Sequence, residues 1–107
     1  MTEQAKLYCN ITALNPVERA HYQELTNKLA LNRRNAIEIA RGYEFQFNAS
    51  AISLADLAEW VAYESKCCPF FDFYIGLRSE STLLSLQLTG ERGVKPFIRA
   101  EFQLPSK

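Results

Sequence analysis

Histidine is nearly missing from the chain, since His21 is the only one among 107 residues. A metal site built mainly from histidine side chains is therefore excluded. His21 stands between Val17 and Leu25 at helical spacing on an apolar face, so we interpret it first as a core histidine with one hydrogen-bonded ring nitrogen. Pairing of His21 with a cysteine as a catalytic base is a second interpretation.

An excess of either charge and a long apolar run are also absent. Lysine and arginine together number 12, as do aspartate and glutamate, which makes the formal net charge zero. Because nucleic-acid-binding proteins usually carry a basic face, we predict no nucleic-acid partner. No segment approaches the roughly 18 apolar residues of a membrane span. The N-terminal segment MTEQAKLYCN lacks the apolar core of a signal peptide, so we expect a cytoplasmic protein without membrane association.

What is present predicts one α+β domain over residues 1–107. The length fits a single domain, and 48% hydrophobic with 22% charged residues is typical of globular proteins. Apolar residues alternate, as in half-buried strands, over residues 7–12, 43–47, 71–77 and 84–88, with a fifth short strand left open over 36–40. Capping signatures and helical spacing predict helices over residues 16–31, 54–67 and 94–102. The predicted order is β-α-β-α-β-β-α, a single sheet of four or five strands with two or three helices packed on one face.

The cysteines are the conspicuous chemistry of the chain. The chain contains three cysteines, an odd number, and no visible export signal. Both observations argue against a disulfide framework and favour reduced thiols. Cys67 and Cys68 are adjacent, and consecutive Cα atoms lie about 3.8 Å apart, short of the roughly 4.4–6.8 Å of an ordinary disulfide. Cys9, on the predicted first strand, could meet Cys68 if that strand lies under the second helix.

Convergence of Cys9, Cys67 and Cys68 would create a soft-metal site. Thiolate sulfur suits zinc, copper(I), mercury or arsenic(III). Glu64, one helical turn before Cys68, is a candidate proton shuttle or weak ligand, and Asp72 and His21 are further candidates for that role. The alternative is that the cysteines are simply core residues, because cysteine is among the most buried residue types, and that Glu64 is a solvated helix residue.

Two segments, ESKCCPFFDF at residues 64–73 and LQLTGERGVKPF at 86–97, resemble a family of small uncharacterised bacterial proteins. They are similar to the family patterns E-R-x-C-C-P-F-x-x-F and L-x-L-T-G-P-E-G-x-K-x-F. An early cysteine before a hydroxyl-containing stretch and the GYEF segment at 42–45 match further family features, so the resemblance covers nearly the whole chain. Lys66, Glu91 and Arg92 depart from the typical pattern, and none of these positions is a thiol.

The resemblance implies an association with heavy-metal or arsenic resistance and a site made of Cys9, Cys67, Cys68 and Glu64. The leading hypothesis is therefore soft metal or metalloid binding through three cysteines. A second hypothesis is a non-catalytic structural or interaction module, which could be a homodimer with its cysteines in the core. A third is a thiol enzyme acting on organometal or redox substrates.

Overall fold

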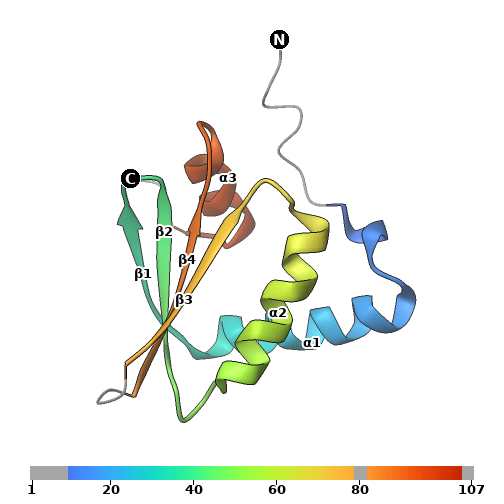
Figure 1. Cartoon of the computed structure of the whole chain (residues 1–107), viewed down its shortest axis with the longest axis horizontal. Helices are drawn as coiled ribbons and strands as arrows, with labels where there is room; N and C mark the ends of the chain where they lie inside the picture. The colour runs from blue at the N-terminus through green and yellow to red at the C-terminus, as the bar shows by residue number, and fades with distance from the viewer. Residues whose placement is uncertain (1–9, 79–81, 105–107) are drawn as a thin grey trace.

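The computed structural model describes residues 10–78 and 82–104 and shows an α+β fold (Figure 1). The predicted fold class is confirmed: three helices accompany one four-stranded antiparallel sheet. A short 3₁₀ turn precedes the first helix. The elements, in chain order, are η2 (Ile11–Ala13), α1 (Pro16–Asn32), β1 (Arg33–Ile39), β2 (Gly42–Asn48), α2 (Leu54–Cys67), β3 (Asp72–Leu77), β4 (Leu83–Thr89) and α3 (Val94–Glu101).

The sheet has the strand order β1-β2-β4-β3, with every neighbouring pair antiparallel. One face is apolar, because Phe45 of β2 lies opposite Leu86 of β4 and both are buried. Phe102, just after α3, contacts the rings of both Phe45 and Trp60 of α2, so these helices cover the same face (Figure 1). The opposite face is polar, as expected for an antiparallel sheet covered on one side. Within the described residues, each helix is too short or too polar to cross a bilayer.

Helix starts follow the predicted capping signals. Asn15 and Glu18 form a capping box, in which the Asn15 side chain accepts from the Glu18 N–H while the Glu18 carboxylate accepts from the Asn15 N–H. Ser53 caps α2 with a single hydrogen bond, which its side chain accepts from the Asp56 N–H. Gly93, which precedes α3, has a φ of 93°, a left-handed conformation that glycine adopts without strain.

The predicted first strand is wrong where the structure describes it. Residues 11–13 form the 3₁₀ turn η2, and residues 7–9 lie outside the described part of the chain. Asn10 is the physical reason, since its side-chain oxygen accepts hydrogen bonds from the N–H and hydroxyl of Thr12. Such local bonds compete with strand pairing. The segment that was left open over 36–40 is a real strand, β1.

The inner face of α1 is rotated from the predicted one. Val17 is 79% exposed, and the His21 side chain is 43% exposed. The interpretation of His21 as a core histidine is therefore wrong. Leu25 and Leu29 are buried as predicted, and Tyr22 turns inward, where its ring stacks on Trp60 at 6.4 Å. The large aromatic pair buries more surface than Val17 would, and it sets the rotation of the helix.

Candidate functional site

Glu64 is the centre of the candidate site. Among the described residues it is the only charged side chain in the core, with 1% exposure. The Tyr22 hydroxyl donates a hydrogen bond of 2.5 Å to Glu64 Oε1, and Cys68 Sγ lies 3.4 Å from Glu64 Oε2. The interpretation of Glu64 as a solvated helix residue is therefore wrong. Glu64 instead lies beside the cysteines, at the position expected of a proton shuttle or weak ligand.

The rotation of α2 explains why Glu64 is buried. Helical spacing predicts an inner face made of Leu54, Leu57, Ala58, Val61, Ser65 and Cys68. Leu57 and Cys68 are buried as predicted, but Leu54, Ala58 and Ser65 are exposed, and the helix instead buries Trp60, Glu64 and Cys67. Trp60 is 2% exposed, and its ring N–H donates to Thr26 Oγ1 at 3.0 Å. A tryptophan with a partner for its N–H prefers the interior. Glu64 and Cys67 follow at helical spacing and lie on the same inward stripe.

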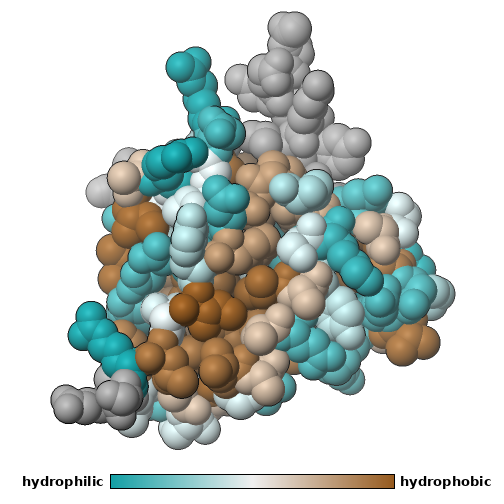
Figure 2. All heavy atoms as spheres, in the orientation of Figure 1, coloured by the Kyte–Doolittle hydropathy of each residue, from teal (hydrophilic) through white to brown (hydrophobic). Residues whose placement is uncertain are grey.

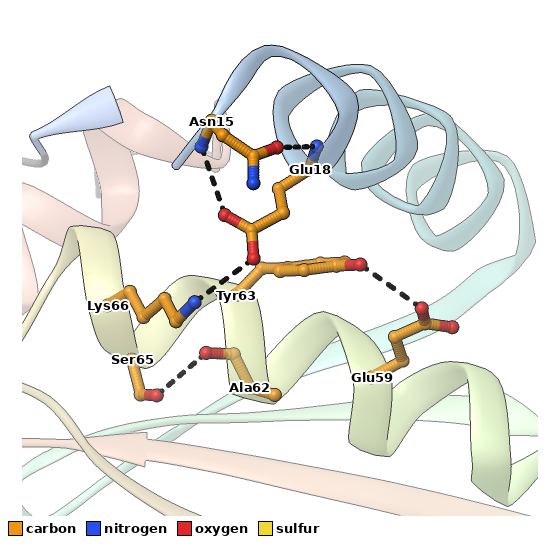
Figure 3. Close-up of polar contacts among 7 residues, drawn as sticks. All are labelled: Asn15, Glu18, Glu59, Ala62, Tyr63, Ser65 and Lys66. Carbon is orange, nitrogen blue, oxygen red and sulfur yellow. Dashed lines mark hydrogen bonds and ion pairs between the residues drawn. The ribbon is translucent and has the colours of Figure 1, made fainter. Parts of the chain in front are cut away.

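The end of α2 is held in place by three backbone or ionic contacts. The Cys68 N–H closes the helix by donating to the Glu64 carbonyl at 2.7 Å, before Pro69. Lys66 forms an ion pair of 3.1 Å with Glu18 at the start of α1 (Figure 3). The Asn10 N–H donates to the Cys67 carbonyl at 2.8 Å. The two helices and the start of the described chain therefore meet around the cysteines.

Burial shapes the electrostatics of the site. Desolvation raises the pKa of Glu64 from 4.5 to about 7, Glu101 of α3 adds repulsion in the same direction, and the Tyr22 hydrogen bond opposes it. Burial and then the Glu64 charge raise the pKa of the Cys67 thiol, against the opposing effect of Lys66. The pKa of Tyr22 is also raised, first by burial. Near neutral pH, Glu64 is thus the group that can gain or lose a proton, while Cys67 and Tyr22 stay protonated.

The two cysteines at the end of α2 differ in covalent state. Both side chains are fully buried. Cys68 is disulfide-bonded, whereas Cys67 is a free thiol. The expectation that every thiol is reduced therefore does not describe Cys68 in this structure. Cys9, the third predicted ligand, lies outside the described residues.

The remaining candidates lie apart from Glu64. His21 contacts Glu59, with its Nδ1 at 3.2 Å from the carboxylate, on a half-exposed surface of α1 and α2. Asp72 is exposed at the start of β3, opposite Thr89 of β4. Across residues 10–78 and 82–104, no three His, Cys, Asp or Glu side chains are grouped as a metal site. The structure thus brings Glu64 together with the two adjacent cysteines and leaves His21 and Asp72 outside.

Tyr22 is the site residue that the sequence did not reveal. It is 42 positions from Glu64 and carries no motif. Its only signal is its spacing to Leu25 and Leu29, which fits an inward position as well as that of His21 does. Only the packing of α1 against α2 identifies it.

Comparisons with known proteins give no match: no family model, no curated protein and no solved structure is similar to this chain. The chemistry of the site is therefore interpreted from its own geometry.

Proposed function

We propose that this chain binds a soft metal or metalloid ion through cysteine sulfur at the end of α2, and that Glu64 accepts the proton that the thiol releases. The supporting observation is the buried Glu64 carboxyl, with a pKa of about 7, at 3.4 Å from Cys68 Sγ. A thiol must lose its proton before it can bind a metal. The C-terminal end of a helix disfavours the resulting thiolate. A proton acceptor beside the sulfur favours loss of the thiol proton and so offsets part of this unfavourable effect.

The proposed ligands are Cys67, Cys68 and Cys9. Soft sulfur ligands select zinc, copper(I), mercury or arsenic(III). The hydrogen bond from the Asn10 N–H to the Cys67 carbonyl keeps the residue after Cys9 at the end of α2. This contact supports the inclusion of Cys9 in the ligand set.

Binding requires the reduced protein. A sulfur that is held in a disulfide has no proton to release and no thiolate to offer. Cys68 is disulfide-bonded in this structure, so that disulfide must be reduced before Cys68 can bind a metal. Two molecules of a small thiol would reduce the disulfide to two protein thiols and would themselves form a disulfide. This reduced form is the one expected in a cytoplasm.

A second candidate function is thiol–disulfide exchange itself, and the disulfide at Cys68 favours it. An external thiolate would attack the partner sulfur, breaking the protein S–S bond and forming a mixed disulfide. Protonated Glu64 would give its proton to the departing Cys68 thiolate. A second external thiol would then release the protein as a dithiol. In this function the free Cys67 takes no part.

Native mass spectrometry of the reduced protein with arsenite or zinc separates the candidates. Metal binding predicts one ion per chain that resists a competing monothiol, and loss of that ion in both Cys67→Ser and Cys68→Ser. Ser65→Ala is the matched control, because Ser65 is exposed on the same turn and its hydroxyl bonds only the Ala62 carbonyl among the described residues (Figure 3). It should bind as the wild type does.

Three other results would redirect the assignment. Uptake that is unchanged in Cys68→Ser would refute the proposed site. No stoichiometric uptake, combined with a disulfide that a glutathione buffer reduces and re-forms even in Cys67→Ser, would favour thiol–disulfide exchange. Neither uptake nor reversible reduction, with a lower melting temperature in both serine variants, would leave the cysteines as core residues of a structural module.

A further inference from the structure

Strand β3 has one unpaired side. In the strand order β1-β2-β4-β3 it lies at an edge, with β4 as its only neighbour in the described sheet (Figure 1). Outside the β3–β4 ladder, residues 72–77 make no backbone hydrogen bond within the described chain. In an edge strand, alternate N–H and C=O groups point away from the sheet and can pair with another strand.

The side chains of β3 do not protect this edge. Tyr74, Ile75 and Leu77 are 58%, 37% and 52% exposed. Figure 2 shows hydrophobic atoms gathered over the area where Figure 1 draws β3 and the start of α2. Soluble proteins usually protect an edge with charged residues, proline or a bulge. Strand β1, at the other edge, follows that rule, because it begins with Arg33 and Arg34 and has a register shift there.

The sequence of β3 complements itself when it is reversed. In an antiparallel pair of two β3 strands centred on Ile75, this residue faces its own copy. Phe73 then faces Leu77, and Tyr74 faces Gly76, so an aromatic ring covers the glycine of the other strand. At both ends, Asp72 of one copy faces Arg78 of the other, with opposite charges.

The two charged residues lie on the correct face for this pairing. Asp72 is paired with Thr89 and Tyr74 with Gln87, on the polar face of the sheet, away from the helices. Arg78 directly follows β3, and alternation along the strand puts it on the same face as Asp72 and Tyr74. On that face, hydrogen bonds from Gln87 and Gln46 lower the pKa of Glu44, and the charge of Arg78 contributes to this shift. Neither Asp72 nor Arg78 forms an ion pair with another described residue.

We infer that β3 is a homodimer interface, in which it pairs antiparallel with β3 of a second copy about a twofold axis at Ile75. The two sheets would become one continuous sheet, with the apolar side of β3 covered by its copy and two Asp72–Arg78 ion pairs on the polar face. An interface of this kind is isologous, as a twofold dimer requires. The inference does not depend on the function of the cysteines.

Sedimentation equilibrium of the full chain over a wide concentration range tests the interface. The wild type should change from the 12.2 kDa monomer to twice that mass. Asp72→Arg alone or Arg78→Asp alone places like charges at both ends and should weaken the dimer about tenfold. The double variant Asp72→Arg/Arg78→Asp restores opposite charges and should recover the wild-type dissociation constant.

Paired lysine variants give an independent test. Ile75→Lys puts two ammonium groups at the axis and should give a monomer, while Ile37→Lys on the other edge strand, at a residue with 44% exposure, should dimerise normally. Circular dichroism checks that each variant is folded. A wild type that stays monomeric throughout, a double charge swap that is no tighter than the single ones, or a dimer lost in Ile37→Lys and kept in Ile75→Lys would overturn the inference.

Discussion

Replacement of Glu64 by glutamine should stabilise the protein above neutral pH. Glutamine has nearly the same shape, and its side-chain oxygen can still accept the hydrogen bond from Tyr22, but it does not ionise. The wild-type carboxyl has a pKa of about 7 in the folded state, raised from 4.5 by burial. The folded protein therefore holds a proton on Glu64 between these two pH values, whereas the unfolded chain has lost it.

The sign and size of the effect follow from proton linkage. The stability that the raised pKa reflects is fully present below pH 4.5 and is lost as pH rises through 7, because the native state binds the extra proton. The pKa of Glu64 is 4.5 in the unfolded chain and about 7 in the folded protein. At pH 8 this difference lowers the free energy of unfolding by about 3 kcal/mol. The groups that act on Glu64 from other elements are Tyr22 of α1 and Glu101 of α3, and the two cysteines lie beside it at the end of its own helix. Tyr22 stays neutral over the pH range of the measurement, because burial raises its pKa.

The assay is urea denaturation at pH 5, 6, 7 and 8 with reductant present, followed by the fluorescence of Trp60, the only tryptophan. The unfolding free energy of Glu64→Gln minus that of the wild type should be small at pH 5 and should grow to about 2–3 kcal/mol at pH 8. Glu24→Gln is the control, since Glu24 is exposed on α1, and its difference should stay flat. A flat difference for Glu64→Gln as well would refute the argument that Glu64 is a buried proton-binding group.

Three further substitutions test the surroundings of the site. Tyr22→Phe removes the hydrogen bond to Glu64 and should cost about 1–3 kcal/mol at pH 8 and less at pH 5, measured in the same denaturation series. Thr26→Val leaves the buried N–H of Trp60 without its partner and should lower stability by about 1 kcal/mol, with a shifted Trp60 emission spectrum. Asn15→Ala breaks the capping box of α1 and should cost about 1 kcal/mol at any of these pH values, with no change in the pH dependence.

Local signals predicted the elements of this fold well. Capping signatures predicted where α1 and α2 begin, and Asn15 and Ser53 form the capping hydrogen bonds at these two starts. The alternation in β2 and β4 is confirmed by their pattern of buried and half-buried residues. These features depend on neighbours within a few positions, and for that reason the sequence alone was sufficient.

The rotation of the helices was not predictable in the same way. Both α1 and α2 carry apolar residues around much of their circumference, so several inward faces fit the spacing equally well. The contact between Tyr22 and Trp60 determines which face of each helix points inward, and it joins residues that are distant in the chain. The first predicted strand failed for the opposite reason, because the side-chain bonds of Asn10 are local but compete with strand formation.

The buried position of Glu64 is an argument that its ability to gain and lose a proton serves a function. A buried carboxylate is normally paired with a cation, but the nearest lysine in sequence, Lys66, reaches Glu18 instead. Among the described residues, the side chain of Glu64 contacts a tyrosine hydroxyl and a cysteine sulfur, and neither supplies the positive charge that would stabilise its ionised form. Packing alone would be served as well by glutamine and without the loss of stability above pH 7. A group that exchanges its proton near neutral pH beside a sulfur is what the proposed thiol chemistry at Cys68 would require.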